Sequence, residues 1–328
     1  MTKKMLTGVR PTGLLHLGHY IGAFKEYIHL QPQYENFLII SDLHMLTTRC
    51  SKEDIAVVGN NAKNIIIDSI AMGIDPHNTT FYLQSNIPEL TYIFVLIQNL
   101  ITIGRAKATP SLTKITREIG IENLPLGLLA YPVLEAGDIL SVQADIVPVG
   151  KDNIDHISMT QEIIDRINKT YGADFPIPEC ISEDKNFVIG LDGAEKMSKS
   201  LNNTIFIRDN ENVIEDKISQ IPWVSPQDTS TVNPIIEYLQ IFEEDKRIAL
   251  SLRQSYFDGQ DVEREAREQL NVTLNTLLNP MRTRVEKYTS NPELVDEILK
   301  DGTLKTRERV NETLEKLKNC MGMYNCCK

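Results

Sequence analysis

Cysteine is scarce in this sequence, and long apolar runs are absent from it. Five of the 328 residues are cysteine, and three of these, Cys320, Cys326 and Cys327, lie at the carboxyl end. So few cysteines exclude a disulfide-bonded scaffold, and the terminal three have neither a C-x-x-C spacing nor a nearby histidine, so we expect no metal site. No segment approaches the roughly 18 consecutive apolar residues that a membrane span requires.

The amino terminus also lacks the features of a targeting signal. The first residues, MTKKMLTGVRPTG, include two lysines with no apolar stretch of signal-peptide length after them. We therefore expect a cytoplasmic protein that does not associate with membranes. The formal net charge of −11 argues against a protein that coats nucleic acid without selectivity, although a local patch could still bind a specific RNA.

Strand-like and helical segments alternate through the first half of the chain. Each of four short apolar segments precedes a helical stretch, at 5–9, 36–41, 80–85 and 145–149. Alternation at this length predicts a parallel, doubly wound α/β sheet with helices on both faces. In such sheets, ligands bind beyond the carboxyl ends of the strands.

The last third of the chain is helical in pattern. From about Val232 few strand-like runs occur, and an apolar stripe is formed by Val310, Leu314, Leu317 and Met321. The stretch YGADFPIPEC, residues 171–180, contains proline and glycine and is the best candidate for a boundary. We therefore predict an α/β domain over 1–180 and an α-helical domain over 181–328.

The segment GVRPTGLLHLGHYIGAF follows the first predicted strand. His16 and His19 are three residues apart, so they share one face of the first helical turn. The free backbone N–H groups and the helix dipole of such a turn suit a phosphate, and imidazoles can donate hydrogen bonds to it or, when protonated, carry part of its charge. The alternative is a pair of helix-start histidines with local structural roles.

A second segment, GLDGAEKMSKS, places Lys196 and Lys199 in a turn-rich loop. Both lysines can reach a polyphosphate as point charges, and a loop of this kind can close over a substrate and stabilise transition-state charge. Taken alone, two lysines at this spacing are usually solvated surface residues.

In this order the two segments resemble the HIGH and KMSKS signatures of class I aminoacyl-tRNA synthetases. The first signature occurs here as HLGH, and the second matches KMSKS letter for letter. Between them, AYPVLEAGDILSVQADIVPVGKDNIDH is similar to the pattern of the tryptophanyl-tRNA synthetases, whereas tyrosyl enzymes carry a glycine-rich GGSDQ-type sequence there. MGIDP, FYLQSNIPE and DGTLKTRERVNETLEKLKNCMGM also fit the bacterial tryptophanyl family, so the resemblance covers essentially the whole chain.

The resemblance implies a Rossmann-like catalytic domain over 1–180, with a KMSKS loop and a helical anticodon-binding region over 181–328. It implies an enzyme that activates L-tryptophan with ATP to tryptophanyl-adenylate and pyrophosphate and then transfers tryptophan to tRNA(Trp). It further implies that Mg²⁺ is held mainly by the ATP phosphates and that the enzyme is a homodimer.

The resemblance also assigns roles to individual residues. The catalytic residues would be His16, His19, Lys196 and Lys199. ATP would bind to Arg10, Pro11, Thr12, Gly18, His19, Gly150, Lys151, Asp152, Phe187, Lys196, Met197, Ser198, Lys199 and Ser200. Tryptophan would bind to Asp138, Tyr131, His44 and Asn153.

Asp138 would determine the choice of amino acid. An indole has one polar group, its N–H, and a buried carboxylate that accepts this N–H would be left unpaired by an analogue that lacks it. Read from the sequence alone, Asp138 could equally be a helix carboxylate with other partners.

The chain departs from the family pattern at several positions. Glu135 stands where many bacterial members have methionine, Gly137 replaces an alanine, and Asn153 replaces a longer glutamine; Arg10 and Lys151 replace a frequent Gln and Glu. A carboxylate beside an indole pocket is costly to desolvate unless it is paired, so Glu135 must either point away or find a cation.

Three other interpretations stay open at this point. The nearest is a tyrosyl-tRNA synthetase. A synthetase-like protein that has lost catalysis and acts as an RNA-binding or regulatory module is opposed by the intact KMSKS. Another HIGH-bearing nucleotidyltransferase is disfavoured by the helical last third.

Overall fold

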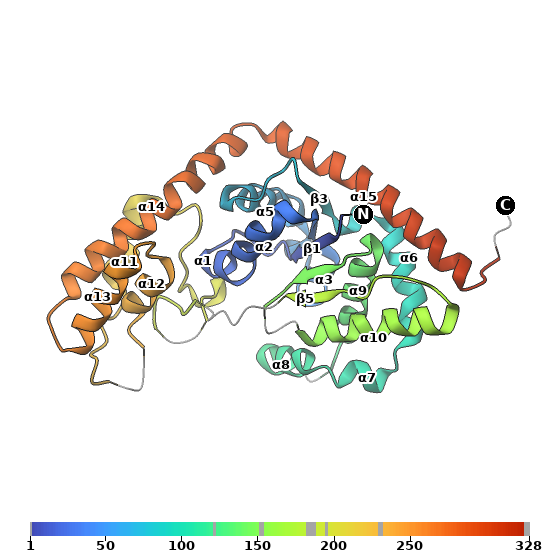
Figure 1. Ribbon diagram of the computed structural model, residues 1–328, viewed down its shortest axis with the longest axis horizontal. Coiled ribbons are helices and arrows are strands. Elements are labelled where there is room, and N and C mark those ends of the chain that lie inside the picture. The colour runs from blue at the N-terminus through green and yellow to red at the C-terminus, as the bar shows by residue number, and fades with distance from the viewer. Residues whose placement is uncertain are drawn as a thin grey trace.

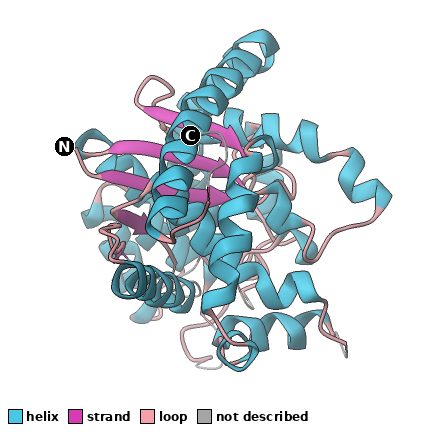
Figure 2. Cartoon of the chain, turned by 90° about the vertical axis from the view of Figure 1, so that its right-hand side faces the viewer, coloured by secondary structure: helices cyan, strands magenta, loops and turns pink. Residues whose placement is uncertain are grey.

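The fold is built around a five-stranded parallel sheet with the strand order β3-β2-β1-β4-β5 (Figures 1 and 2). The computed structural model describes residues 2–120, 123–150, 154–181, 188–193, 196–228 and 232–324. The strands are β1 (Lys4–Val9), β2 (Glu35–Ile40), β3 (Thr79–Leu83), β4 (Ile146–Pro148) and β5 (Glu179–Ile181). The predicted doubly wound parallel sheet is confirmed, and so are its first four strands.

The helices of the first half pack on both faces of this sheet, which lies between helices in Figure 2. They are α1 (Leu17–His19), α2 (Lys25–Leu30), α3 (Asp42–Met45), α4 (Lys52–Ala56), α5 (Val58–Met72), α6 (Pro88–Ile97), α7 (Ile103–Lys107), α8 (Pro110–Ile119), α9 (Leu126–Val142) and α10 (Ile154–Tyr171). A π-helical segment, Tyr20–Phe24, joins α1 to α2, so the helical stretch that follows the first strand is continuous but not uniform.

Alternate residues of the strands feed two separate cores. In β2, Leu38 and Ile40 pack into a cluster that includes residues of α5. Phe37 and Ile39 point the other way, into a cluster with residues of α6, α9 and α10. Because successive side chains of a strand face opposite sides, a strand that is buried on both faces becomes a continuous apolar run.

The last part of the chain is helical, as predicted. Its helices are α11 (Glu211–Gln220), α12 (Pro234–Phe242), α13 (Lys246–Phe257), α14 (Glu263–Thr289) and α15 (Pro292–Cys320). In Figure 1, α14 and α15 form an arch over the sheet, and α15, in red, returns across it towards the carboxyl terminus. The predicted apolar stripe lies on α15, where Val310, Leu314 and Leu317 are buried in the second core cluster.

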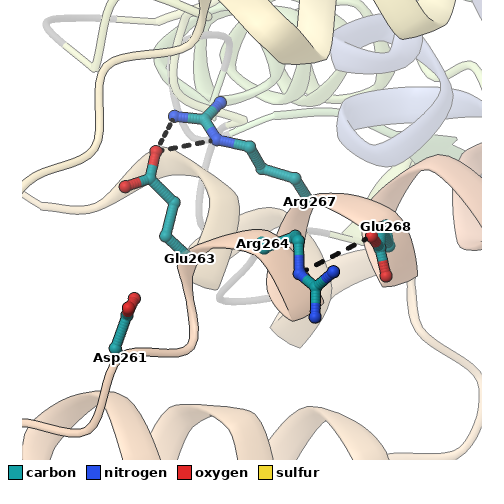
Figure 3. A pocket seen from close by; sticks show the side chains of 5 residues that line it. All are labelled: Asp261, Glu263, Arg264, Arg267 and Glu268. Carbon is teal, nitrogen blue, oxygen red and sulfur yellow. Dashed lines mark hydrogen bonds and ion pairs between the residues drawn. The ribbon is translucent and has the colours of Figure 1, made fainter.

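The beginning of α14 is tied to the end of α11 by Arg267. Its guanidinium donates to the carbonyl oxygens of Ile218 at 2.6 Å and Ile221 at 2.9 Å, and it pairs with Glu263 at 2.6 Å (Figure 3). Together with Asp261, Arg264 and Glu268, these side chains line a depression of about 360 Å³. Its arginines already contact neighbouring carboxylates, so we assign this depression a structural role.

Helix α15 covers the outer edge of β3, the strand at one end of the sheet. At the crossing point a Cβ on Gly302 would lie 1.9 Å from the carbonyl oxygen of Phe81, so the helix backbone touches the strand directly. Covering an edge strand prevents it from pairing with another chain. Among the described helices, none is both long and apolar enough to cross a bilayer.

We expect Gly302→Ala to destabilise the fold, because the added methyl group has no room beside the Phe81 carbonyl. The free energy of unfolding, measured by chemical denaturation, should fall by about 2–3 kcal/mol. The matched control is Gly59→Ala in α5, where the added carbon meets nothing within 4 Å. That helix substitution should be neutral or stabilise by up to about 1 kcal/mol. Equal stability of the two variants would contradict the close contact.

Candidate active site

The HLGH segment begins α1, which follows the loop that leaves the carboxyl end of β1. The two histidines cap this turn reciprocally: the Nδ1 of His16 accepts from the backbone N–H of Gly18 at 3.1 Å, and the Nδ1 of His19 accepts from that of His16 at 3.2 Å. Because each Nδ1 is an acceptor, each neutral ring carries its proton on Nε2. A Cβ on Gly18 would lie 2.9 Å from the His16 ring, so only glycine fits beneath it.

Both imidazoles are neutral near pH 7. Burial, and then the positive charges of Lys199 and Lys196, lower the pKa of His16 to about 4. Burial and the neighbouring His16 hold the pKa of His19 well below its ordinary value. The rings can therefore offer Nε2–H groups to a ligand, but they do not add positive charge at this pH.

The KMSKS segment is anchored by its middle residues. The backbone N–H of Met197 donates to the carbonyl of Val188 at 2.8 Å, and the Met197 side chain is buried in the first core cluster. The backbone N–H of Ser198 donates to Oδ1 of Asn203 at 2.7 Å, and the Ser198 and Ser200 hydroxyls lie 2.9 Å apart. The anchored methionine leaves Lys196 and Lys199 on either side of it.

Lys199 joins the two signature segments directly. Its Nζ donates to the carbonyl oxygens of Thr12 at 3.1 Å and Leu14 at 3.2 Å, which lie in the loop that leads to HLGH. Gly13 between them has a φ of 109°, a conformation that favours glycine. Burial, followed by the charge of Arg49, lowers the pKa of Lys199 to about 8. Residues that are 187 positions apart in the sequence therefore meet at one edge of the sheet.

Backbone hydrogen bonds hold the same two regions together. The N–H of Leu17 donates to the carbonyl of Ile205 at 3.0 Å, and the N–H of Ile207 donates to the carbonyl of Leu15 at 3.1 Å. His16 and Phe206 form an antiparallel bridge between them. The segment that follows KMSKS is thus paired with the HLGH segment itself.

Asp68 of α5 reinforces this junction. Its fully buried carboxylate accepts from the backbone N–H of Leu15 at 2.9 Å and from Nε of Arg208 at 2.6 Å. Arg208 also donates to the carbonyl oxygen of Asn64 at 3.2 Å. The sequence analysis did not identify Asp68 or Arg208, although an aspartate inside the apolar run NIIIDSIAM was a visible signal.

A second group of side chains surrounds Asp138 on α9. Its carboxylate accepts from Nε2 of His44 at 2.8 Å and from Nε2 of Gln84 at 2.8 Å, and burial raises its pKa. The rings of His44 and Tyr131 meet edge to face with 6.3 Å between their centroids. The structure thus brings three of the four expected tryptophan-binding residues together. Gln84, which directly follows β3, was missed by the sequence analysis.

Glu135 is paired rather than exposed to the pocket as a lone charge. Its Oε2 lies 2.8 Å from Nδ1 of His156, a side chain on α10 that is almost fully buried. Burial alone would lower the pKa of His156, but the hydrogen bond and charge of Glu135 raise it above its ordinary value. Of the two outcomes that the sequence left for Glu135, the structure has the one in which it is paired: its partner is an imidazole, which is a cation only when protonated.

The remaining expected ligand residues are unevenly placed. Arg10, Pro11 and Thr12 lie in the loop that leaves β1, and Gly150 follows β4, the neighbouring strand. Lys151, Asp152, Asn153 and Phe187 lie outside the described residues. Within the described part of the chain, no three His, Cys, Asp or Glu side chains are grouped as ligands for a metal ion.

Comparison with known proteins assigns this chain to a class. The family described as tRNA synthetases class I (W and Y) matches residues 2–326, which is nearly the whole chain. The chain therefore belongs to the class I tRNA synthetases for tryptophan and tyrosine.

Individual relatives narrow this assignment to tryptophan–tRNA ligases. The chain is 36% identical to the tryptophan–tRNA ligase of Treponema pallidum, over 98% of this chain and 97% of the relative. It is 37% identical to the tryptophan–tRNA ligase of Borreliella burgdorferi, over 98% of this chain and 94% of that relative. The structure of tryptophanyl-tRNA synthetase from Campylobacter jejuni, complexed with ADP and tryptophan, matches with a TM-score of 0.83 and 29% identity, over 98% of this chain and 100% of that one. The chain is an ATP-dependent aminoacyl-tRNA ligase of this family.

We expect Asp68→Ala to destabilise the junction of the two signature segments, because it leaves the Arg208 guanidinium and the Leu15 N–H without their acceptor. The free energy of unfolding should fall by about 3 kcal/mol. The control is Asp296→Ala, which removes a carboxylate from an exposed pair with Lys63 and should cost less than about 1 kcal/mol.

A double variant separates the charge pair from other effects of this substitution. Asp68→Leu with Arg208→Met leaves neither charge unpaired, so it should recover part of the loss. If Asp68→Ala proves as mild as Asp296→Ala, the buried carboxylate does not hold the junction.

Proposed function

We propose that ATP binds where Lys199 meets the HLGH loop, and that this site joins tryptophan to AMP. The observation that carries the proposal is the hydrogen bond between Lys199 Nζ and the Thr12 carbonyl, because it brings the KMSKS segment to the loop that leads to the two histidines. Lys196, Lys199, and the Nε2–H groups of His16 and His19 would contact the phosphates.

The proposed reaction needs no general base. The tryptophan carboxylate is ionised at neutral pH and attacks the α-phosphorus of ATP, and pyrophosphate leaves. Charge accumulates on the pentavalent phosphorus and on the departing pyrophosphate, so catalysis depends on donors and cations placed around them. Mg²⁺ would be held mainly by the phosphates, since the proposed contacts around them are neutral imidazoles and ammonium groups rather than carboxylates.

The residues proposed to contact ATP extend along the same edge of the sheet. Arg10, Pro11, Thr12 and Gly18 would line ATP from the β1 loop, and Met197, Ser198 and Ser200 from the KMSKS segment. Gly150, Lys151, Asp152 and Phe187 would meet the ribose and adenine.

Tryptophan would lie in the pocket around Asp138. This carboxylate has hydrogen bonds from His44 and Gln84, and its remaining lone pairs can accept the indole N–H. Tyr131 and Asn153 would face the substrate's ammonium group. The 36% and 37% identical relatives, both tryptophan–tRNA ligases, support this choice of amino acid.

The proposed second step transfers tryptophan to the 3′ end of tRNA(Trp). Residues 1–180 would form the catalytic part, and the helices within 181–328 would read the anticodon. Because tRNA is aminoacylated where proteins are made, the proposal places the enzyme in the cytoplasm.

The proposed assembly is a homodimer. Its support is an apolar groove of about 500 Å³ between α6 and α9, lined by Leu43, Pro88, Thr91, Tyr92, Phe94, Val95 and Leu134. Tyr92 and Val95 are exposed there, and apolar surface of this kind is typical of a contact between subunits.

The direct test of the proposed function is ATP–pyrophosphate exchange measured with each of the twenty amino acids in turn. We expect exchange with tryptophan and none with tyrosine, because tyrosine carries its one ring donor, the phenol O–H, at a different position from the indole N–H that Asp138 would accept. Exchange with tyrosine instead would identify the tyrosyl enzyme. No exchange with any amino acid would support an RNA-binding or regulatory module.

We expect Lys199→Ala to slow adenylate formation about a hundredfold or more while weakening ATP binding much less, because the ammonium acts on charge that develops in the transition state. Single-turnover kinetics measure the first quantity and equilibrium binding of ATP measures the second. Equal losses in both would indicate a role in binding alone.

The pH profile provides a second readout for the same side chain. Because the pKa of Lys199 is about 8, kcat/KM for ATP should fall as the pH rises through about 8 and the ammonium loses its proton. Lys199→Arg keeps its charge through this range, so that variant should show no such fall.

A further inference from the structure

A chain of four hydrogen-bonded side chains borders the amino-acid pocket, and the proposed reaction uses only one of them. Glu135 Oε2 lies 2.8 Å from Nδ1 of His156, and the Nε2 of that ring lies 2.8 Å from the Tyr131 hydroxyl. The Oγ of Ser111 contacts the same Nε2 of His156. The Tyr131 hydroxyl also donates to this Ser111 Oγ, at 3.3 Å. The four residues come from α8, α9 and α10.

The carboxylate determines which nitrogen of His156 carries the proton. An ionised carboxylate can only accept, so the Nδ1 that faces Glu135 must donate to it. In the neutral ring the other nitrogen, Nε2, is then an acceptor, and the Tyr131 hydroxyl can donate to it. Without Glu135 the ring could place its proton on Nε2 and donate to the Tyr131 oxygen instead.

The direction of this hydrogen bond changes what Tyr131 can offer a substrate. When its O–H donates to His156 or Ser111, the lone pairs of the phenol oxygen stay open towards the pocket. An ammonium group has three donors and no acceptor, so it needs such an oxygen. When Nε2–H donates to Tyr131, one lone pair is occupied and the hydroxyl proton turns towards the substrate.

We propose that Glu135 is a positioning residue for the ammonium group of the amino-acid substrate. It acts through His156, whose proton it keeps on Nδ1, and thereby makes Tyr131 a hydrogen-bond acceptor towards the substrate. The inference rests on the proposed function, because it takes the ammonium of tryptophan to lie against Tyr131.

Burial and charge around His156 are consistent with this arrangement. The side chains of His156 and Glu135 are 3% and 24% exposed, so their hydrogen bond is largely shielded from water. The groups that face the ring are Glu135 and Tyr131 from α9, Ser111 from α8, and Asp155 of α10, whose Oδ1 lies 4.0 Å from Nε2. Glu135 is the one that contacts Nδ1.

The first test compares two substitutions of Glu135 by tryptophan-dependent exchange, at a pH above the acid-side fall in kcat/KM that marks protonation of His156 and below the fall near pH 8 expected from Lys199. Glu135→Met has a similar length but no acceptor, and we expect it to raise KM for tryptophan about tenfold. Glu135→Gln keeps an acceptor oxygen and should raise it less, by about threefold. KM for ATP should change less than about twofold in both variants. The control, Glu162→Met, removes a carboxylate that pairs with Arg105 and should leave both constants unchanged.

The second test asks whether Glu135 acts through Tyr131. Tyr131→Phe removes the oxygen, so adding Glu135→Met to it should raise KM for tryptophan by less than about twofold more. Indole-3-propionate lacks the ammonium group, so its inhibition constant should be the same for Glu135→Met and the unmodified chain. A full tenfold effect of Glu135→Met in the Tyr131→Phe background, or on indole-3-propionate, would overturn the inference.

The pH profile distinguishes positioning from a general loss of structure. Below the pKa of His156 the charged ring donates to Tyr131, so kcat/KM for tryptophan should fall as the pH decreases through that pKa. Glu135 raises this pKa, so Glu135→Met should move the fall to lower pH. If Glu135→Met still supports tryptophan-dependent exchange but its kcat/KM falls at the same pH as in the unmodified chain, the inference is contradicted. If the unmodified chain shows no such exchange, the proposed function and this inference fail together.

Discussion

The carboxylate of Asp68 joins three parts of the chain that are far apart in the sequence. From the middle of α5 it accepts hydrogen bonds from Leu15, just before HLGH, and from Arg208, just after KMSKS. The backbone bridge between His16 and Phe206 lies beside it. A buried carboxylate is costly unless it is fully paired. The fold therefore favours the arrangement in which both segments lie against Asp68 and donate to it. The proposed phosphate site depends on that arrangement.

Electrostatics divide the site into two halves. Towards the phosphates, neutral His16 and His19 stand beside Lys199, so donors and positive charge are concentrated where negative charge would develop. Towards the amino acid, the carboxylates of Asp138 and Glu135 are both paired within the pocket wall. Acceptors there suit the two kinds of N–H that tryptophan carries, on its indole and its ammonium group.

Much of the fold and part of the site could be predicted from the sequence. The four strands identified by their apolar runs are all present in the five-stranded sheet, because burial on both faces requires such runs. β5 was missed, since its residues Glu179–Ile181 follow a proline-containing stretch and give no apolar run of their own. The long return of α15 across β3 depends on the Gly302 contact with Phe81, a packing feature that no local pattern encodes.

The residues that the sequence analysis missed share one property: their partners are distant in the chain. Gln84 reaches Asp138 across 54 positions, and Asp68 reaches Arg208 across 140. A motif search finds residues that contact a ligand, whereas these side chains fix the ones that do. Glu135 stood out as a departure from the family pattern, but its partner His156 became evident only from the packing of α9 against α10.

The central claim is that one site formed by HLGH, KMSKS and the Asp138 pocket holds ATP and tryptophan side by side. A crystal structure of the complete chain with tryptophan and a non-hydrolysable ATP analogue tests it most directly. The account predicts phosphates between His16, His19 and the two KMSKS lysines, with the indole N–H on Asp138. Phosphates bound away from both segments, or an indole that does not reach Asp138, would contradict it.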